Sequence, residues 1–275
     1  MQWWCSSQSV AWDWTWRPYA GVWFLVIATA TAYGLHLRAL ARSRSPAAAA
    51  VRTRHPVLFG LGLMWLWAAL DWPLGTLGSS YLASVHMVQF LLVALLAPPL
   101  LLLGLPPGTY DLLRHSPRLH GAINSVTQPV AAFFIFNVVM SVSHWPSVVD
   151  ALMTTQLGSF GLDMSWLVSG LIFWWPLLCP VPERPKFPFL MKIVYLGLNV
   201  VLLRPPFVIL VYSKFPVYAT YELAPPIAGT SALDDQQLAG VIMKVGSAWI
   251  MLVAMTVMFV MWHRAQQHGA TPSTP

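Results

Sequence analysis

Three residues of this chain are of the types that bind copper, and all three fall at a similar depth in long apolar stretches. His86, His144 and Met243 supply two imidazole rings and one thioether sulfur. Imidazole nitrogen suits copper in general, and a methionine sulfur favours Cu(I). We therefore treat these three residues as a candidate copper site.

Five charged residues fall in or beside the same layer. A charged side chain at such a depth in a membrane is costly, so it usually faces the bundle interior and pairs with another group or with water. The simpler interpretation stays open, since some of these residues lie at helix ends, where interfacial water reaches them. The charged cluster comprises Asp71, Asp163, Asp235, Lys244 and Arg204.

The composition shows why a membrane is expected at all. Of 275 residues, 57% are hydrophobic and only 9% are charged, whereas a soluble domain carries about 25% charged residues. One water-soluble core of this size cannot hide that much apolar surface, so the chain is predicted to be a polytopic membrane protein. Two cysteines, Cys5 and Cys179, are too few for a disulfide framework or a four-cysteine metal site.

The elements that must position the polar layer are predicted to be seven transmembrane helices, which makes the fold class all-α. Each apolar stretch is near the length that crosses a bilayer as a helix, and none alternates with the period of a barrel strand. The predicted spans are Tyr19–Leu37, Val57–Trp72, Tyr81–Leu103, Val126–Ser143, Ser159–Cys179, Leu190–Val211 and Leu238–Trp262.

The net charge of +6 comes from basic residues that collect in alternate loops. Because Lys and Arg mark cytoplasmic loops, the N-terminus is predicted outside, the C-terminus in the cytoplasm, and no nucleic-acid partner is expected. Three regions follow from this topology. They are a Trp-rich interfacial segment on the outer face (1–18), the seven-helix membrane domain (19–265) and a disordered cytoplasmic tail (266–275).

Several short motifs, in order, resemble those of the CtaG-like family of cytochrome c oxidase assembly proteins. The resemblance covers roughly Pro56 to Trp262 and implies a seven-helix membrane fold whose members are associated with installing copper in haem–copper oxidases. The motifs are His86-Met-Val-Gln, Ala97-Pro-Pro-Leu-Leu-Leu-Leu-Gly104, His144-Trp-Pro, Gly170-Leu-Ile-Phe-Trp-Trp-Pro176 and Asp235-Gln-Gln-Leu-Ala-Gly240 leading to Met243.

Three positions depart from the family pattern. Phe90 stands where the family has a second histidine one helical turn after His86, and Asp163 replaces another histidine. Lys244 takes the place of a residue that is usually aromatic. These replacements suggest a degenerate copper site, in which the Lys244 ammonium pairs with Asp163 or Asp71 and would repel Cu(I).

Two main functions follow, and neither makes the protein an enzyme. The first is an assembly factor for a haem–copper oxidase that handles Cu(I) at the outer face of a bacterial-type plasma membrane. The second is an accessory subunit of an oxidase or another membrane complex, which kept the scaffold and lost the metal. A transporter is a third alternative, weakened by the lack of internal repeats. Besides membrane lipids, the expected partner is that membrane complex, and no haem is expected.

Overall fold

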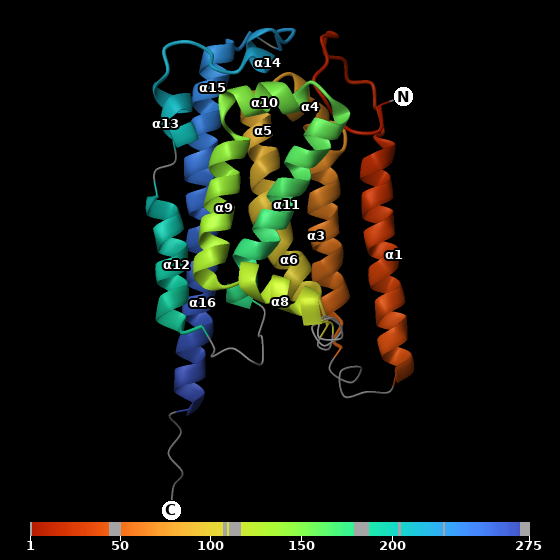
Figure 1. Ribbon diagram of the computed structural model, residues 1–275, viewed down its shortest axis with the longest axis vertical. Helices are drawn as coiled ribbons and strands as arrows, with labels where there is room; N and C mark the ends of the chain where they lie inside the picture. Colours follow the sequence, from red (N-terminus) through yellow and green to blue (C-terminus); the bar gives the residue numbers. More distant parts are fainter. Residues whose placement is uncertain are drawn as a thin grey trace, which may run out of the picture.

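The computed structural model describes residues 2–43, 51–106, 109, 117–178, 187–202, 205–227 and 229–269. All regular elements in these residues are helices, which confirms the predicted all-α class. The long helices stand side by side along one axis, with α1 (Ala20–Ser43) at the edge of the bundle (Figure 1). Helix α16 continues through the predicted tail boundary to Gly269, and residues 270–275 lie outside the described residues.

Five helical segments are long and apolar enough to cross a membrane. They are α1, the continuous helix Ala83–Gly104, α11 (Gln156–Leu178), the interrupted helix Phe189–Tyr212 and the segment Ala232–Arg264. The count rises to seven if each of two bent helix pairs is one span. These pairs join α3 (Arg54–Leu70) to α4 (Leu74–Ser80) at 43°, and the end of α8 (Pro117–Val126) to α9 (Pro129–Ser143) at 73°.

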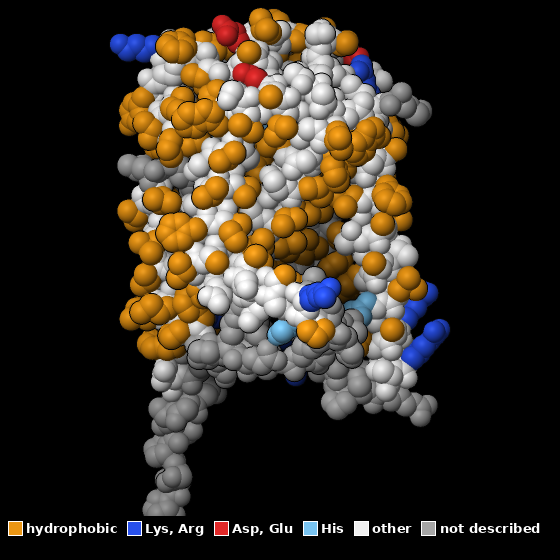
Figure 2. All heavy atoms as spheres, in the orientation of Figure 1, with side chains coloured by type: hydrophobic (Ala, Val, Ile, Leu, Met, Phe, Trp, Pro, Cys, Tyr) orange, Lys and Arg blue, Asp and Glu red, His pale blue; other side chains and the backbone are white. Residues whose placement is uncertain are grey.

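The surface has the pattern of a protein that lives in lipid. Figure 2 shows apolar side chains over the middle of the bundle, with charged side chains near its two ends. Large apolar residues such as Phe24, Val130 and Val201 are more than 70% exposed, which water would penalise and a bilayer does not. The chain is therefore a multi-pass membrane protein.

One end of the bundle holds most of its short elements. We call it the N-terminal end, because residues 2–18 lie there together with α4, α10 (Pro146–Met153) and α14 (Ala219–Glu222) (Figure 1). The opposite end holds α8 and the C-terminal part of α16. Where the structure describes them, the charged residues that separate the two sets of loops follow this division, with Arg38, Arg42 and Arg54 at one end and Asp150, Glu222 and Asp234 at the other.

The long spans that carry the predicted site are not uniform α-helices. In Ala83–Gly104, α5 (Ala83–Phe90) continues through the π-helix η1 (Leu91–Leu96) into α6 (Ala97–Gly104). Pro98 and Pro99 cannot donate to the carbonyls four residues earlier, and their rings would clash with those carbonyls. A wider π-turn before the prolines relieves this conflict.

Helix α11 packs against this proline region through a glycine. A Cβ atom on Gly170 would stand 2.2 Å from the carbonyl oxygen of Ala94 and 2.9 Å from Cγ of Pro98. Backbone at η1 cannot move aside as a flexible side chain would, so only glycine allows the two spans this approach. The contact sets the depth and rotation of α11, which carries Asp163.

We therefore expect Gly170→Ala to lower the free energy of unfolding by about 1–3 kcal/mol, the usual effect of overpacking a core. The matched control is Gly161→Ala in the same helix, where a Cβ atom would meet nothing within 4 Å. There the gain in helix propensity, about 1 kcal/mol, should leave the protein as stable or slightly more stable. Thermal unfolding in detergent micelles measures both, and equal melting temperatures for the two variants would contradict the packing argument.

Candidate functional site

His86 lies near the start of α5, and Asp235 holds that start in place. Asp235 belongs to α15 (Ala232–Val241). Its Oδ2 accepts hydrogen bonds from the backbone N–H groups of Ala83 (2.6 Å) and Ser84 (3.3 Å), and its Oδ1 accepts one from the Ser84 hydroxyl. The carboxylate therefore does for α5 what an N-cap side chain does, although it comes from a distant part of the chain.

The His86 imidazole is buried and has no hydrogen-bond partner on either ring nitrogen. Its ring is 2% exposed and lies 4.9 Å from the Trp166 ring and 6.0 Å from the rings of His144 and Tyr221, measured between centroids. A neutral imidazole carries one donor and one acceptor, and leaving both unused in a protein interior is costly. Such a side chain is suited to a ligand that the protein receives from outside.

His144 follows the C-terminal end of α9, and its ring lies 6.0 Å from the His86 ring, with Trp166 beside both. Its Nδ1 lies 2.9 Å from the carbonyl oxygen of Met140. Nδ1 also lies 3.1 Å from the Ser143 hydroxyl oxygen. The tautomer with its hydrogen on Nδ1 suits the Met140 carbonyl, which can only accept, and leaves the Nε2 lone pair for a metal. The ring stacks on Trp166 at 5.3 Å, and Phe90 packs against it edge-on at 4.8 Å.

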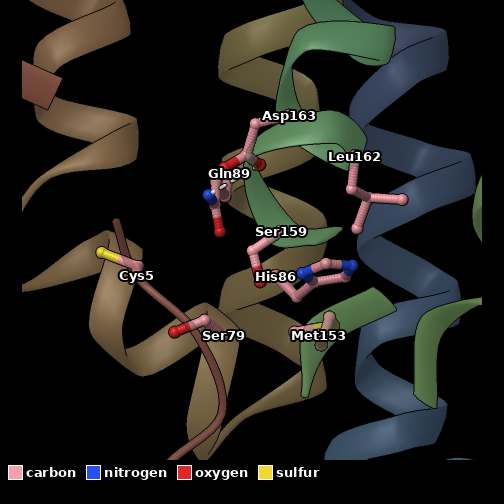
Figure 3. Close-up of a pocket in the computed structure, with 8 residues that line it drawn as sticks. All are labelled: Cys5, Ser79, His86, Gln89, Met153, Ser159, Leu162 and Asp163. Atoms are coloured by element: carbon pink, nitrogen blue, oxygen red, sulfur yellow. Dashed lines mark hydrogen bonds between the residues drawn. The ribbon is translucent and has the colours of Figure 1, made fainter. Parts of the chain in front are cut away.

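A small cavity of about 10 Å³ opens beside His86. Its volume is about that of one water-sized sphere. Figure 3 shows His86, Met153 and Ser159 grouped together, Gln89 meeting Asp163, and Cys5 on the N-terminal segment at the other side. The lining residues are Cys5, Ser79, His86, Gln89, Met153, Ser159, Leu162 and Asp163.

The methionine that lines this cavity is Met153, at the end of α10, and not the predicted Met243. Met243 is 1% exposed and belongs to the π-helix η2 (Ile242–Gly246), which packs against α5. The Met153 sulfur accepts a hydrogen bond from the Tyr221 hydroxyl at 3.7 Å. The structure thus offers a second thioether for a soft metal, on the side of His86 where there is space.

Asp163 is 4% exposed and has two neutral donors. The Trp4 indole nitrogen donates to Oδ2 at 2.8 Å, and the Gln89 amide donates to Oδ1 at 3.2 Å. These bonds replace part of the water that the carboxylate loses on burial. The Trp-rich segment therefore reaches inside the bundle at Trp4, which is fully buried, while Trp14 is 71% exposed.

Asp71 is satisfied in the same way at the end of α3. Its Oδ1 accepts from the backbone N–H of Tyr19 (3.1 Å), and its Oδ2 accepts from the Trp23 indole (2.9 Å). Nearby, burial raises the pKa of the Tyr19 phenol to about 12, so its hydroxyl is neutral where it meets Thr76 at 2.9 Å. Both buried aspartates thus use uncharged donors.

The predicted ion pair between Lys244 and Asp163 or Asp71 is wrong. The Lys244 ammonium instead donates to the backbone carbonyls of Val200 (2.5 Å) and Leu202 (3.4 Å). These carbonyls lie where α12 (Phe189–Val201) ends and α13 (Pro205–Tyr212) begins. Because a proline has no N–H, Pro206 cannot serve the Leu202 carbonyl, and the ammonium supplies a donor at this break.

The remaining predicted residues do not build a larger metal site. Arg204 lies outside the described residues, so the structure does not place it. Within the residues described, no group of three or more His, Cys, Asp or Glu side chains is arranged to hold a metal ion. The two imidazoles with a nearby methionine are therefore the set that could bind copper.

The sequence held a signal for some of the cavity residues that the prediction omitted. Gln89 lies three residues after His86, and Ser159 lies four before Asp163, so each shares a helix face with a predicted residue. Gln89 Oε1 and Ser159 Oγ are buried without hydrogen-bond partners beside the same cavity. No comparable signal marks Met153, because its helix α10 is a short element outside the predicted spans.

A double-mutant cycle tests the new assignment of Lys244. Lys244→Met should lower the free energy of unfolding by about 1–3 kcal/mol, because the Val200 and Leu202 carbonyls lose their charged donor. In the cycle with Asp163→Asn, the two effects should add to within about 0.5 kcal/mol, as expected for residues without direct contact. The exposed Lys214→Met serves as control and should change little. Unfolding in mixed micelles measures all variants, and a coupling energy above 1 kcal/mol between Lys244 and Asp163 would show that the two side chains do interact.

The comparisons with known proteins agree with the family resemblance in the sequence. Residues 31–265 match the family described as cytochrome c oxidase caa3 assembly factor (Caa3_CtaG). No curated protein and no solved structure shows a significant match. The family match runs from the second half of α1 to the last turns of α16, and so includes His86, His144 and all the residues that line the cavity except Cys5. The chain therefore belongs to the caa3 cytochrome c oxidase assembly factor family.

Proposed function

We propose that this protein supports assembly of a haem–copper cytochrome c oxidase by holding Cu(I) as cargo at the N-terminal end of the bundle. The observation that carries the proposal is the buried His86 imidazole, whose two ring nitrogens have no partner beside a cavity that Met153 also lines. Imidazole and thioether are ligands that Cu(I) accepts. The family's role in oxidase assembly supplies the destination of the metal.

His144 is the second nitrogen ligand in this proposal. Its Nδ1 hydrogen bond favours the tautomer that leaves Nε2 as the basic atom. The centroids of the His86 and His144 rings are 6.0 Å apart, which allows one nitrogen of each ring to lie about 2 Å from a shared ion. A site with two or three ligands and a buried position suits a carrier, which must release its metal as well as bind it.

The proposed topology places this site at the outer face of a bacterial plasma membrane. Arg38, Arg42 and Arg54 belong to the end opposite residues 2–18, and clusters of arginine mark the cytoplasmic side. The site then lies at the depth from the outer surface where an assembling oxidase subunit in the same membrane could reach it. Seven spans, with each bent pair counted as one, fit this topology because the termini then fall on opposite sides.

The test is Cu(I) binding by the purified protein in detergent, in competition with a chromophoric Cu(I) chelator. Wild type should retain about one Cu(I) per chain, and His86→Ala should lose at least tenfold in affinity, because a direct ligand matters at least as much as an outer-shell partner. His263→Ala, an exposed histidine of α16, is the matched control and should bind as wild type does. In cells that lack the chromosomal copy, His86→Ala should lower the copper content of the oxidase and His263→Ala should not.

A second candidate function is an accessory subunit that no longer binds copper. It is favoured by Phe90, whose ring packs against His144 at 4.8 Å where a ligating side chain could otherwise stand, and by Asp163, whose carboxylate is engaged by Trp4 and Gln89. This function requires that wild type retain no Cu(I) in the chelator competition and that the chain copurify with the mature complex in a fixed ratio. Copper bound by wild type and lost in His86→Ala would exclude it.

A further inference from the structure

The first residues of the chain enter the N-terminal end of the bundle. Trp4, Cys5 and Ser6 are at most 4% exposed, although the chain on either side of them is partly or fully exposed. We call residues 2–10 the N-terminal strap. The family match begins at residue 31, so the strap lies outside the part of the chain that defines the family.

On one side the strap is bonded to α10 and α11. The backbone N–H groups of Trp3 and Trp4 both donate to Oε1 of Gln156, at 2.7 and 3.3 Å. The N–H of Ser7 donates to the carbonyl of Met153 at 2.8 Å. Met153 and Gln156 flank the turn between the two helices, so the strap crosses this turn beside the cavity.

On the other side the strap is bonded to α3 and α4. The Cys5 thiol donates to the Leu70 carbonyl at 3.2 Å, and the Ser80 hydroxyl donates to the Ser6 carbonyl at 3.0 Å. The strap therefore bridges helices on both sides of the cavity and closes the end of the bundle between them.

The strap also forms part of the cavity wall. Cys5 lines the cavity together with His86, as Figure 3 shows. The Trp4 indole fills the space above Asp163, donates to its carboxylate at 2.8 Å and packs edge-on against Phe160 at 4.9 Å. A ligand that approached His86 past the strap would meet Cys5, which lines the cavity next to the buried Trp4.

The bonds that hold the strap are of a kind that can open. Among the described residues, hydrogen bonds and ring contacts join it to the helices, and neither a disulfide nor an ion pair does so. Cys5 is a free thiol, and burial raises its pKa well above the usual value. Segments that few hydrogen bonds hold to the rest of a protein can open at a free-energy cost well below that of global unfolding.

We propose that the N-terminal strap is a lid on the His86 cavity, and that a solute reaches the cavity from this end only while residues 2–10 are displaced. That the solute in cells is Cu(I) rests on the proposed function. The lid itself does not, since it follows from the strap's contacts alone, and its test uses no metal. Trp4 is the residue that holds the lid shut, through its indole hydrogen bond and its burial.

The experiment places a thiol inside the cavity and measures its reactivity. Both native cysteines are replaced (Cys5→Ser, Cys179→Ser), and Ser159→Cys puts a sulfur where the serine hydroxyl lines the cavity without a partner. The control is Thr154→Cys in the same background, an exposed position on the adjoining turn. A small, polar thiol reagent is added to the protein in micelles, and the modification rates are followed by mass spectrometry.

With the strap intact, the thiol at 159 should react at least a hundredfold more slowly than the thiol at 154. Trp4→Phe keeps an aromatic ring but loses the indole donor, and should raise the rate at 159 about tenfold, the equivalent of about 1.4 kcal/mol for one charge-assisted hydrogen bond. Deletion of residues 2–10 should raise it further. Trp14→Ala, which removes an exposed ring, should leave it unchanged, and none of these changes should alter the rate at 154.

Two results would overturn the lid. One is a thiol at 159 that reacts as fast as the thiol at 154 in the intact protein. The other is a rate at 159 that stays the same in Trp4→Phe and in the deletion, in samples whose melting curves show folded protein. Trp4→Phe keeps the test valid if the deletion does not fold. If the protein binds no Cu(I) but the labelling rate at 159 depends on the strap, the lid is supported and the proposed copper cargo is wrong. If the protein binds Cu(I) but the labelling rate does not depend on the strap, the cargo is supported and the lid is wrong.

Discussion

Three carboxylates buried at one end of an apolar bundle must each find hydrogen-bond donors, and this requirement ties distant parts of the chain together. Asp71 draws in the backbone of Tyr19 and the indole of Trp23 from α1. Asp163 draws in Trp4, and Asp235 reaches from α15 to the start of α5. Because water is scarce at these positions, each partnership is worth more than a similar bond at a soluble surface. The partners of these three carboxylates therefore determine how the N-terminal end of the molecule is assembled, and Asp163 also lines the cavity.

The sequence was sufficient to predict the parts of the structure that depend on the length of the apolar runs. Apolar runs of about twenty residues predicted the helical class and the long spans, and the polar residues inside those runs identified His86, His144 and Asp163 as buried neighbours of one region. Depth along a helix can be counted in residues, so a layer is predictable.

The choice of partners within that layer could not be predicted in the same way. Lys244 has the depth of an ion-pair partner, yet it bonds to the carbonyls of Val200 and Leu202, and a backbone carbonyl leaves no mark in the sequence. The Trp-rich composition of residues 1–18 predicted an interfacial position for Trp4, but the Asp163 carboxylate inside the bundle accepts its indole hydrogen. Met153 lies on α10, a short helix outside the apolar runs that predicted the spans. In each case the deciding factor is the rotation of a helix or the path of a loop, which residue spacing alone does not fix.

The break between α12 and α13 has a consequence for how the protein is made. Lipid offers no donor to the carbonyls of Val200 and Leu202. The ammonium that donates to them belongs to a segment that is synthesised later, about forty residues further along the chain. Until that segment is inserted, the earlier one has exposed polar backbone in its apolar interior. The segments Phe189–Tyr212 and Ala232–Arg264 therefore depend on each other in a bilayer, because the second carries the donor for the carbonyls at the break in the first.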